Sequence, residues 1–310
     1  MLVLVAPGQG AQKPGLLAPW LELPGVTDKI AEWSAAIGMD LVHYGTEAGA
    51  EEIRDTAVAQ PLLVAASLIS AGELLEGRDP ARLFGAVAGH SVGELAAASV
   101  AGVLSPTDTM TLVRARGTAM AEAAAVTDTG MSAVLGGEPD AVVAHLEKLG
   151  LTPANMNGAG QIVAAGTAEQ LAELAADKPE KARVIPLKVA GAFHTEHMAP
   201  AVDVLARAVE DAEVHDPALP YVSNLDGNAV TDGRKIVQRL VGQISASVRW
   251  DLCTETFQQL GVTALVELCP GGTLTGLAKR SLPGVRTLAL KTPDDLDAAR
   301  ELIAEHTQTA

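Results

Sequence analysis

The chain has 310 residues, and 48 % of them are hydrophobic, which is enough for a packed core and excludes a disordered or fibrous protein. Its 38 acidic residues outnumber the 22 basic ones, so the formal net charge is −16 at pH 7. Non-specific nucleic-acid binding and attachment to an anionic membrane both depend on Lys and Arg, so we expect neither nucleic acid nor a membrane surface as a partner. A chain of this length makes one large domain, or a large domain with a small companion.

The two cysteines and the N-terminal segment indicate an intracellular protein. Cys253 and Cys269 show no CxxC spacing, so we expect reduced thiols rather than a disulfide framework or a cysteine-based zinc site. The apolar segment 1–6 lacks a basic region and ends at Pro7, which is not the pattern of a signal peptide. The longest apolar stretch, near residues 62–69, is shorter than the about 20 residues that span a bilayer. We therefore expect a cytoplasmic protein.

Strands and helices alternate in the first part of the chain. The apolar run at 2–6 predicts a buried strand, with Pro-Gly-Gln-Gly as its exit turn. A mostly apolar segment at 57–75 predicts a helix buried on most sides, and residues 84–88 predict a second buried strand. Helices are predicted at 92–103, which is rich in alanine, and at 105–120, which opens on Ser-Pro. Apolar strands followed by helices favour an α/β fold around a parallel sheet.

The middle of the chain predicts a separate, inserted domain. Its expected order is strand, helix, strand, strand, helix, strand, which is the ferredoxin-like order. The six predicted elements are residues 131–137, 138–150, 151–159, 161–167, 168–179 and 181–191. We therefore predict a small domain at 127–191, inserted into a large domain made of 1–126 plus 192–310. The remaining predicted elements of the large domain are a helix from Met198, strands at 221–223 and 263–268, and a helix around 274–280.

The segment Gly89-His90-Ser91-Val92-Gly93 follows a predicted strand and opens a predicted helix, which is the pattern of a GxSxG nucleophile elbow. A sharp strand-to-helix turn lifts the serine hydroxyl clear of the sheet, and the flanking glycines let strand and helix approach without clashing Cβ atoms. The helix N-terminus adds backbone N–H donors where an oxyanion would form. The motif alone is weak, since glycine and serine are common. Its position between strand and helix favours Ser91 as a nucleophile over an inert serine in a tight turn.

A nucleophilic serine needs a base, and the sequence has seven histidines. Four of them lie in helical or surface-like stretches without a partner, namely His43, His145, His215 and His306. His90 is next to Ser91, and neighbouring side chains at a sharp turn point apart, so His90 is a poor base. The other two lie in Gly-Ala-Phe-His-Thr-Glu-His-Met, where His194 is favoured because it follows an apolar strand at a junction. This segment lacks the HExxH zinc spacing and a clear third ligand, so no metal is expected.

The order of these groups differs from that of ordinary α/β-hydrolases, in which an acid lies between the serine and a late histidine. More than a hundred residues follow His194, and no Asp or Glu stands out between it and Ser91. The imidazole needs only an acceptor for its second ring N–H. A backbone carbonyl is therefore an alternative to the missing acid.

Together these motifs resemble those of the malonyl-CoA:acyl-carrier-protein transacylase family of type II fatty-acid synthesis and its relatives in polyketide synthases. The resemblance covers essentially the whole chain. The ordered motifs that carry it are PGQG at 7–10, AQP at 59–61, GHSVG at 89–93, RG at 116–117, NGAGQIVAAG at 157–166, AFH at 192–194 and VELCPGGTLTGL at 266–277. The resemblance implies a hydrolase-like large domain with a ferredoxin-like insert, which matches the element order above.

The resemblance also implies roles for residues of this sequence. Ser91 is similar to the acylated nucleophile and His194 to its base. The backbone N–H groups of Gln9 and Val92 would form the oxyanion hole. Gln243 aligns with the position whose main-chain carbonyl holds the catalytic histidine, which would replace the missing acid.

Arg116 matches the family arginine that grips the malonyl carboxylate. A guanidinium can donate two parallel, charge-assisted hydrogen bonds to a carboxylate, and a thioesterase for neutral acyl chains would not need it. Gln60 matches a residue that lines the acyl pocket, and His90 and Asn155 are further substrate-binding candidates. In polyketide acyltransferases a Phe at the position of Phe193 accompanies the choice of malonyl over methylmalonyl. Here the motif reads Gly-Ala-Phe-His rather than the full His-Ala-Phe-His, which weakens that rule.

The expected function is ping-pong transfer of malonyl from malonyl-CoA to the phosphopantetheine thiol of acyl carrier protein, by a monomer without a cofactor. A serine hydrolase or thioesterase on the same scaffold and a non-catalytic docking subunit of a larger synthase are the alternatives. Acyl carrier proteins are typically acidic and so is this chain, so docking should use a local basic patch. The candidates are Lys181, Arg183 and Lys188 in the insert and Arg234, Lys235 and Arg239 in the large domain.

Overall fold

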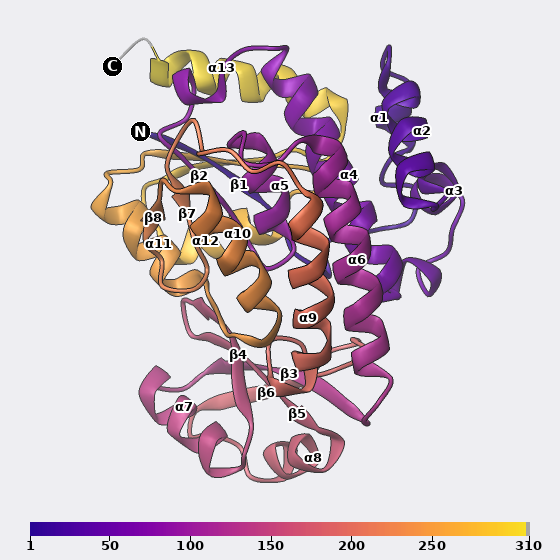
Figure 1. Ribbon diagram of the computed structural model, residues 1–310. Helices are drawn as coiled ribbons and strands as arrows, with labels where there is room; N and C mark the ends of the chain where they lie inside the picture. Colours follow the sequence, from indigo (N-terminus) through magenta and orange to yellow (C-terminus); the bar gives the residue numbers. More distant parts are fainter. Residues whose placement is uncertain (308–310) are drawn as a thin grey trace.

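The computed structural model describes residues 1–307 and contains two β-sheets with helices packed on them (Figure 1). The larger sheet has the strand order β11-β10-β1-β2-β7-β8, and every neighbouring pair is parallel except β7–β8 at one edge. Its strands are β1 (Leu2–Ala6), β2 (Ala86–Gly89), β7 (Tyr221–Val222), β8 (Ala229–Val230), β10 (Ala264–Glu267) and β11 (Arg286–Ala289). The predicted α/β fold with a parallel core is therefore confirmed.

Helices cover both faces of the larger sheet, because its central strands are apolar along their whole length. Alternate residues of β1 enter different cores: Leu2 and Leu4 pack with α4 and α5, whereas Val3 and Val5 pack with α11 and α12. The helices around this sheet are α1 (Ala18–Leu21), α2 (Val26–Ile37), α3 (Leu41–Thr46), α4 (Thr56–Leu75), α5 (Gly93–Val100), α6 (Pro106–Ala124), α9 (Ala199–Ala208), α10 (Gly233–Gly242), α11 (Trp250–Gln259), α12 (Thr273–Ser281) and α13 (Leu296–Thr307).

The two longest helices, α4 and α6, lie side by side and carry two residues of the site described below (Figure 1). Each begins at a side-chain cap, Asp55 for α4 and Ser105 for α6. Helix α4 is the one helix among residues 1–307 that is long and apolar enough to cross a membrane, so the expectation that no segment reaches that length is wrong. About four-fifths of it is buried inside the fold, and a core helix has the same apolar composition.

The smaller sheet has the strand order β6-β3-β5-β4-β9, and the first four strands pair antiparallel in the ferredoxin-like arrangement predicted from the sequence. Helices α7 and α8 cover the face that is turned away from the larger sheet (Figure 1). The elements are β3 (Thr129–Gly136), α7 (Pro139–Lys148), β4 (Thr152–Gly158), β5 (Gln161–Thr167), α8 (Ala168–Ala176) and β6 (Ala182–Pro186). The domain boundaries at 127 and 191 stay a prediction.

Two features of the smaller sheet differ from the prediction. The last strand was expected to reach residue 191 but ends at Pro186. Leu187 still donates its N–H to the carbonyl oxygen of Met131 at 2.9 Å, and Leu187 and Val189 then line the cavity described below. The short strand β9 (Val248–Arg249) comes from the chain after residue 192 and pairs parallel with β4. The sheet of the insert is therefore completed by a strand from the other predicted domain.

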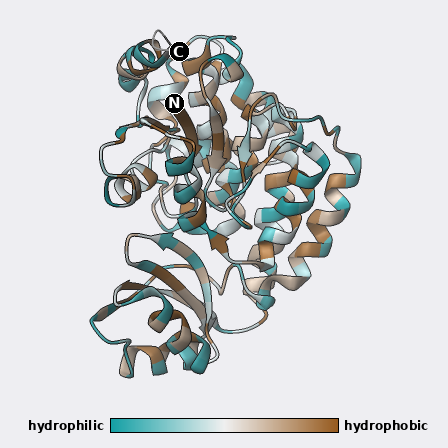
Figure 2. Cartoon of the chain, turned by 90° about the vertical axis from the view of Figure 1, so that its left-hand side faces the viewer, coloured by the Kyte–Doolittle hydropathy of each residue, from teal (hydrophilic) through white to brown (hydrophobic). Residues whose placement is uncertain are grey.

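The hydropathy pattern follows this layering. In Figure 2 hydrophobic residues concentrate along the strands, while the outward-facing helices carry hydrophilic residues on their exposed sides. The smaller sheet has its own core, in which Val134 and Ile162 pack with Leu146 and Leu174 from the two covering helices. The two layers meet at the carboxyl ends of β1 and β2, and the candidate site lies there.

Candidate active site

The turn between β2 and α5 places Ser91 in a backbone conformation that only a tightly packed elbow imposes. Its φ is +52°, in the left-handed region that residues other than glycine rarely adopt. A Cβ on Gly89 would lie 2.0 Å from the carbonyl carbon of Gly93, and a Cβ on Gly93 would lie 2.3 Å from the carbonyl oxygen of Ala6. Both glycines are therefore required for the close approach of strand and helix that the sequence predicted.

Asn224, which follows β7, braces this elbow from the side of the sheet. Its Oδ1 accepts the backbone N–H of Ser91 at 2.8 Å, and its Nδ2 donates to the carbonyl oxygen of Gly89 at 2.8 Å. Asn224 is fully buried, so both bonds are shielded from water. The sequence analysis missed this residue, since no motif surrounds it.

The structure brings Ser91 and His194 together. Ser91 Oγ lies 2.7 Å from Nε2 of His194, and Nδ1 of the same ring lies 2.8 Å from the main-chain carbonyl oxygen of Gln243. A carbonyl can only accept, so Nδ1 carries the proton and Nε2 is left free to accept the serine proton. The carbonyl occupies the position that an acid takes in a Ser-His-Asp triad. The ring is buried, and burial together with the nearby charge of Arg116 lowers the pKa of His194 to about 3.

Arg116, on α6, is 1 % exposed and lies directly behind the nucleophile. Its Nη1 donates to Oε1 of Gln60 at 2.6 Å, and its Nη2 donates to Oε1 of Gln243 at 2.9 Å and to Ser91 Oγ at 3.4 Å. Burial lowers the pKa of Arg116 to about 10, so the side chain stays a cation at neutral pH. Among residues 1–307 it makes no ion pair, so its buried positive charge is contacted only by the neutral side chains of Gln60, Gln243 and Ser91.

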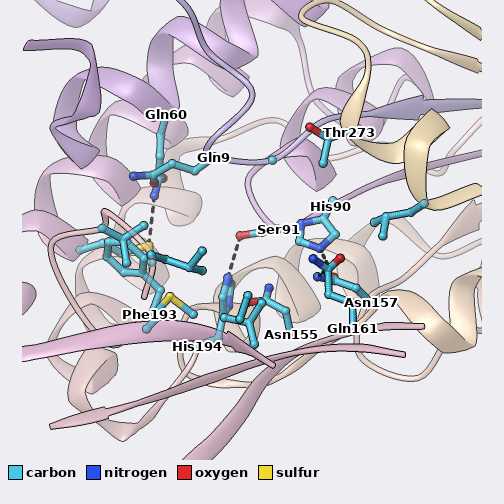
Figure 3. A pocket seen from close by; sticks show the side chains of 18 residues that line it. Gln9, Gln60, His90, Ser91, Asn155, Asn157, Gln161, Phe193, His194 and Thr273 are labelled. Carbon is cyan, nitrogen blue, oxygen red and sulfur yellow. Dashed lines mark hydrogen bonds between the residues drawn. The ribbon is translucent and has the colours of Figure 1, made fainter. Parts of the chain in front are cut away.

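A cavity of about 220 Å³ opens above Ser91 between the two sheets. Figure 3 shows Ser91 and His194 at its centre, with Gln60 and Phe193 on one side and His90 and Thr273 on the other. The remaining lining residues are Gly8, Gln9, Met120, Met131, Ala133, Asn155, Asn157, Gln161, Val163, Leu187, Val189 and Leu277. The predicted substrate-binding residues Gln60, His90, Asn155 and Phe193 all line it, whereas Arg116 is reached through Gln60 and Ser91.

Backbone N–H donors lie beside the nucleophile. Val92 is the residue before the first turn of α5, and Gln9 lies in the loop after β1, with its side chain bonded to Thr56. Gly8 packs directly on the elbow, because a Cβ there would lie 2.8 Å from the carbonyl oxygen of His90. Within the described residues, no protein acceptor meets the backbone N–H of either Gln9 or Val92. Both donors are available to an oxyanion.

The ring of His90 points away from Ser91, as the sequence predicted. Its Nε2 lies 2.8 Å from Oδ1 of Asn157, and its ring packs edge-on against Trp250 at 5.7 Å between centroids. Burial lowers the pKa of His90 as well. His90 therefore links the elbow to the smaller sheet, and Asn157 is a further cavity residue that the sequence analysis did not single out.

A buried carboxyl group, that of Glu94, contacts two residues of the site. Glu94 is in the first turn of α5 and is 1 % exposed; its Oε1 accepts the backbone N–H of Asn224 at 2.8 Å, and its Oε2 accepts from Nε2 of Gln243. Burial raises the pKa of Glu94 to about 7. The sequence analysis did not identify Glu94, because a Glu three residues after the serine also reads as an ordinary helix N-terminal acid.

Comparison with known proteins agrees with this geometry. A family model described as an acyl transferase domain matches residues 3–288. A malonyl CoA-acyl carrier protein transacylase of Mycobacterium tuberculosis is 52 % identical to this chain. The alignment covers 97 % of this chain and 100 % of the relative. The crystal structure of MCAT from Mycobacterium tuberculosis superposes with a TM-score of 0.92 at 52 % identity, over 97 % of this chain and 99 % of that one.

A further solved structure contains a partner. It is a type II polyketide-synthase acyl-carrier protein in complex with its malonyl-transacylase, and the matching chain has a TM-score of 0.89 at 32 % identity over 97 % of this chain and 99 % of its own. Both the sequence identity and the coverage are far above what fold similarity alone would give. The chain is therefore a member of the malonyl-CoA–acyl carrier protein transacylases, within the acyl transferase domain family.

Proposed function

We propose that this chain transfers the malonyl group of malonyl-CoA to the phosphopantetheine thiol of an acyl carrier protein, through an ester on Ser91. One observation carries the proposal: the Ser91 hydroxyl lies between a neutral imidazole at 2.7 Å and a buried guanidinium at 3.4 Å. The base makes the hydroxyl a nucleophile, and the buried cation favours an acyl group that ends in a carboxylate. Family membership supports the same function in fatty-acid synthesis, and polyketide synthesis is a further use.

In the acylation step, Nε2 of His194 takes the Ser91 proton as Oγ attacks the thioester carbonyl carbon. The backbone N–H groups of Gln9 and Val92 donate to the oxyanion that forms. The carbon–sulfur bond then breaks, and the sulfur of coenzyme A leaves with the proton that His194 returns. The carbonyl of Gln243 keeps the ring oriented and stabilises the transient imidazolium.

The second half-reaction repeats the first with another thiol. The phosphopantetheine thiol gives its proton to His194 and attacks the malonyl ester, and Ser91 leaves with that proton. The same oxyanion donors serve both steps because the ester carbonyl stays in place. The products are the free enzyme and the malonyl thioester of the carrier protein, so no cofactor takes part.

The malonyl carboxylate binds Arg116. In the free enzyme Oε1 of Gln60 accepts from Nη1 of Arg116, and a substrate carboxylate would replace this neutral acceptor by a charged one. Phe193 lies on the same side of the cavity as Gln60 (Figure 3), Met120 lies next to Gln60 with its sulfur 3.5 Å from Nε2, and Met131 also lines the cavity. An extra methyl group on the α-carbon would meet these side chains, so we propose malonyl over methylmalonyl selectivity. One methylene of pocket volume is worth about 1–3 kcal/mol.

The carrier protein docks on the insert cluster, which we define as Lys181, Arg183 and Lys188. Lys188 lines two grooves next to the cavity, beside Gln9 and beside Thr56, so an anionic partner there is close to the site. Lys181 of the insert cluster lies 3.6 Å from Glu180, and Arg239 of the other predicted cluster donates to both oxygens of Asp226. The choice of the insert cluster therefore rests on Lys188 and its position next to the cavity. We further propose that the enzyme works as a cytoplasmic monomer.

The alternative of a hydrolase is separated from a transferase by the fate of the acyl-enzyme. The experiment treats the purified chain with malonyl-CoA, removes excess substrate and follows the intact protein mass with time. We expect a malonyl adduct on Ser91 that holo acyl carrier protein discharges at least about 100-fold faster than water does. Loss to water at the same rate with and without carrier protein would make the enzyme a thioesterase. The Ser91→Ala variant should acquire no adduct.

A further inference from the structure

Next to the site lies a buried ionisable group that the mechanism above does not use, namely Glu94. Both of its carboxylate oxygens accept N–H donors, one from the backbone of Asn224 at 2.8 Å and one from the side chain of Gln243. Gln243 in turn accepts from Nη2 of Arg116 at 2.9 Å. A continuous chain of hydrogen bonds therefore joins Glu94 to Arg116 beneath the nucleophile, with one carboxamide as its only link.

The direction of this chain depends on Glu94. A carboxamide has one acceptor end and one donor end, whereas a guanidinium only donates and a carboxylate only accepts. Gln243 can turn its oxygen to Arg116 only if its NH₂ group meets acceptors on the other side. It meets three, namely the Glu94 carboxylate, the carbonyl oxygen of Ser91 at 3.0 Å and Oδ1 of Asn224 at 3.4 Å. Glu94, the one acceptor of these that can carry a charge, thus contributes most strongly to the orientation of the Gln243 side chain.

The same arrangement keeps Arg116 free for substrate. When it is ionised, Glu94 supplies a negative charge to the buried guanidinium without touching it, because the Gln243 carboxamide lies between them. A carboxylate in direct contact with Arg116 would instead compete with a carboxylate of the substrate for the same donors. With the Gln243 carboxamide in between, the Glu94 carboxylate can compensate the charge of Arg116. It does so without occupying the N–H groups of the guanidinium that face Gln60 and Ser91.

We propose that Glu94 is a positioning residue for malonyl transfer: acting through the side chain of Gln243, it holds Arg116 in the orientation that receives the substrate carboxylate. This inference rests on the proposed function. It predicts that loss of Glu94 harms a substrate that uses Arg116 much more than one that does not. A merely structural role would harm both equally.

The test uses Glu94→Gln, which keeps the size and shape of the side chain and removes only its charge and one acceptor. The new side-chain oxygen can still accept from Asn224, but its NH₂ then faces the NH₂ of Gln243, so the link to Arg116 breaks while the brace on the elbow stays. Acylation of Ser91 in the purified full chain is followed by intact mass with malonyl-CoA and with acetyl-CoA, which lacks the carboxylate. We expect the malonyl rate to fall at least about tenfold and the acetyl rate less than about threefold.

A double-mutant cycle with Arg116→Ala makes the test sharper. If Glu94 acts through Arg116, adding Glu94→Gln to Arg116→Ala lowers malonyl acylation by less than about twofold. Equal losses on both substrates, no loss on either, or losses that multiply in the double variant would each overturn the inference. Should Glu94→Gln fail to fold, Glu94→Asp keeps a carboxylate but shortens its reach to Gln243, and it must show the same malonyl-selective loss.

The matched control is Tyr221→Phe. The Tyr221 hydroxyl contacts the backbone carbonyl of Glu94 at 3.3 Å, so the variant disturbs the same buried region without breaking the link through Gln243. We expect its ratio of malonyl to acetyl rates to stay within about twofold of the wild-type ratio. Failure of the proposed function is a separate outcome: the wild-type chain would then take up no malonyl group on Ser91 at all.

Discussion

At the scale of single residues, the site depends on a buried cation placed beside a neutral base. Arg116 lies 3.4 Å from the serine oxygen, and its charge is one of the two largest causes that keep His194 unprotonated. The acyl group that suits this arrangement brings its own negative charge, which completes the ligands of the guanidinium. Two predictions follow from this pair.

The first concerns substrate charge. Arg116→Ala should slow malonyl acylation of Ser91 at least about 100-fold, because breaking a buried charge pair costs about 3–5 kcal/mol. Acetyl acylation should fall less than about tenfold, since acetyl has no carboxylate. The control is Arg114→Ala on the same helix, which removes a guanidinium bonded to the carbonyl oxygen of Ala57. Stopped-flow acylation with both thioesters measures the ratio, and an equal loss on both would remove the role given to Arg116.

The second concerns pH. The pKa of His194 falls from 6.5 in the unfolded chain to about 3 in the folded one, so below pH 6.5 the unfolded chain binds a proton that the folded chain does not. This histidine therefore contributes stability above pH 6.5 that is lost as the pH falls towards 3. Relative to His194→Gln, the wild type should lose free energy of unfolding by up to about 1.4 kcal/mol per pH unit between pH 6 and 4.

Urea unfolding at several pH values measures this difference, and subtracting the two proteins cancels the other titrating groups. A wild-type minus His194→Gln difference that does not change with pH would contradict the buried, neutral histidine.

At the scale of secondary-structure elements, most of the fold could be predicted because the signals are local. The apolar strands, the capped helices and the GxSxG motif are each contained in fewer than about 20 residues, so periodicity and turn chemistry suffice to place them. Ser91 and His194 were predicted in this way, and the structure brings them within 2.7 Å of each other. Arg116, Gln9 and the Gln243 carbonyl needed the family resemblance, because nothing local distinguishes a buried Arg on a helix from a surface one.

The rest could not be predicted because it depends on contacts between distant segments. Asn224 reaches the elbow across 133 residues, and Glu94 and Gln243 meet across 149. Strand β9 has two residues and pairs only because the smaller sheet offers an open edge at β4. Strand β6 ends at Pro186, and Leu187 and Val189 beyond it form part of the cavity wall. Such features follow from tertiary packing rather than from sequence pattern.

The elbow itself gives an element-scale prediction. Gly93→Ala should lower the free energy of unfolding by at least about 2 kcal/mol, because its Cβ would sit 2.3 Å from a backbone oxygen of β1 that cannot move alone. Gly276→Ala is the control: it lies inside α12, where a Cβ meets nothing within 4 Å, so it should stabilise by about 0.5–1 kcal/mol. Thermal or urea unfolding of both variants checks this, and a neutral Gly93→Ala would refute the close approach.

At the scale of the whole molecule, the net charge of −16 opposes binding of an acidic carrier protein, so local positive charge must guide docking. Lys188→Glu should raise the KM for holo acyl carrier protein at least about fivefold, with little change in kcat. Arg82→Glu is the matched control, because Arg82 precedes β2 and lies at the opposite end of that strand from Ser91. Equal KM values for the two variants would show that the carrier protein does not dock at Lys188.

The most direct measurement of the central claim is a crystal structure of the malonylated enzyme, obtained by soaking malonyl-CoA into crystals of the wild-type enzyme without carrier protein, so that no acceptor thiol discharges the ester. We predict an ester on Ser91 Oγ whose carbonyl oxygen points to the backbone N–H groups of Gln9 and Val92. Its terminal carboxylate should lie within hydrogen-bond distance of the Arg116 guanidinium. A malonyl group attached elsewhere, or a carboxylate turned away from that guanidinium towards solvent, would contradict the account.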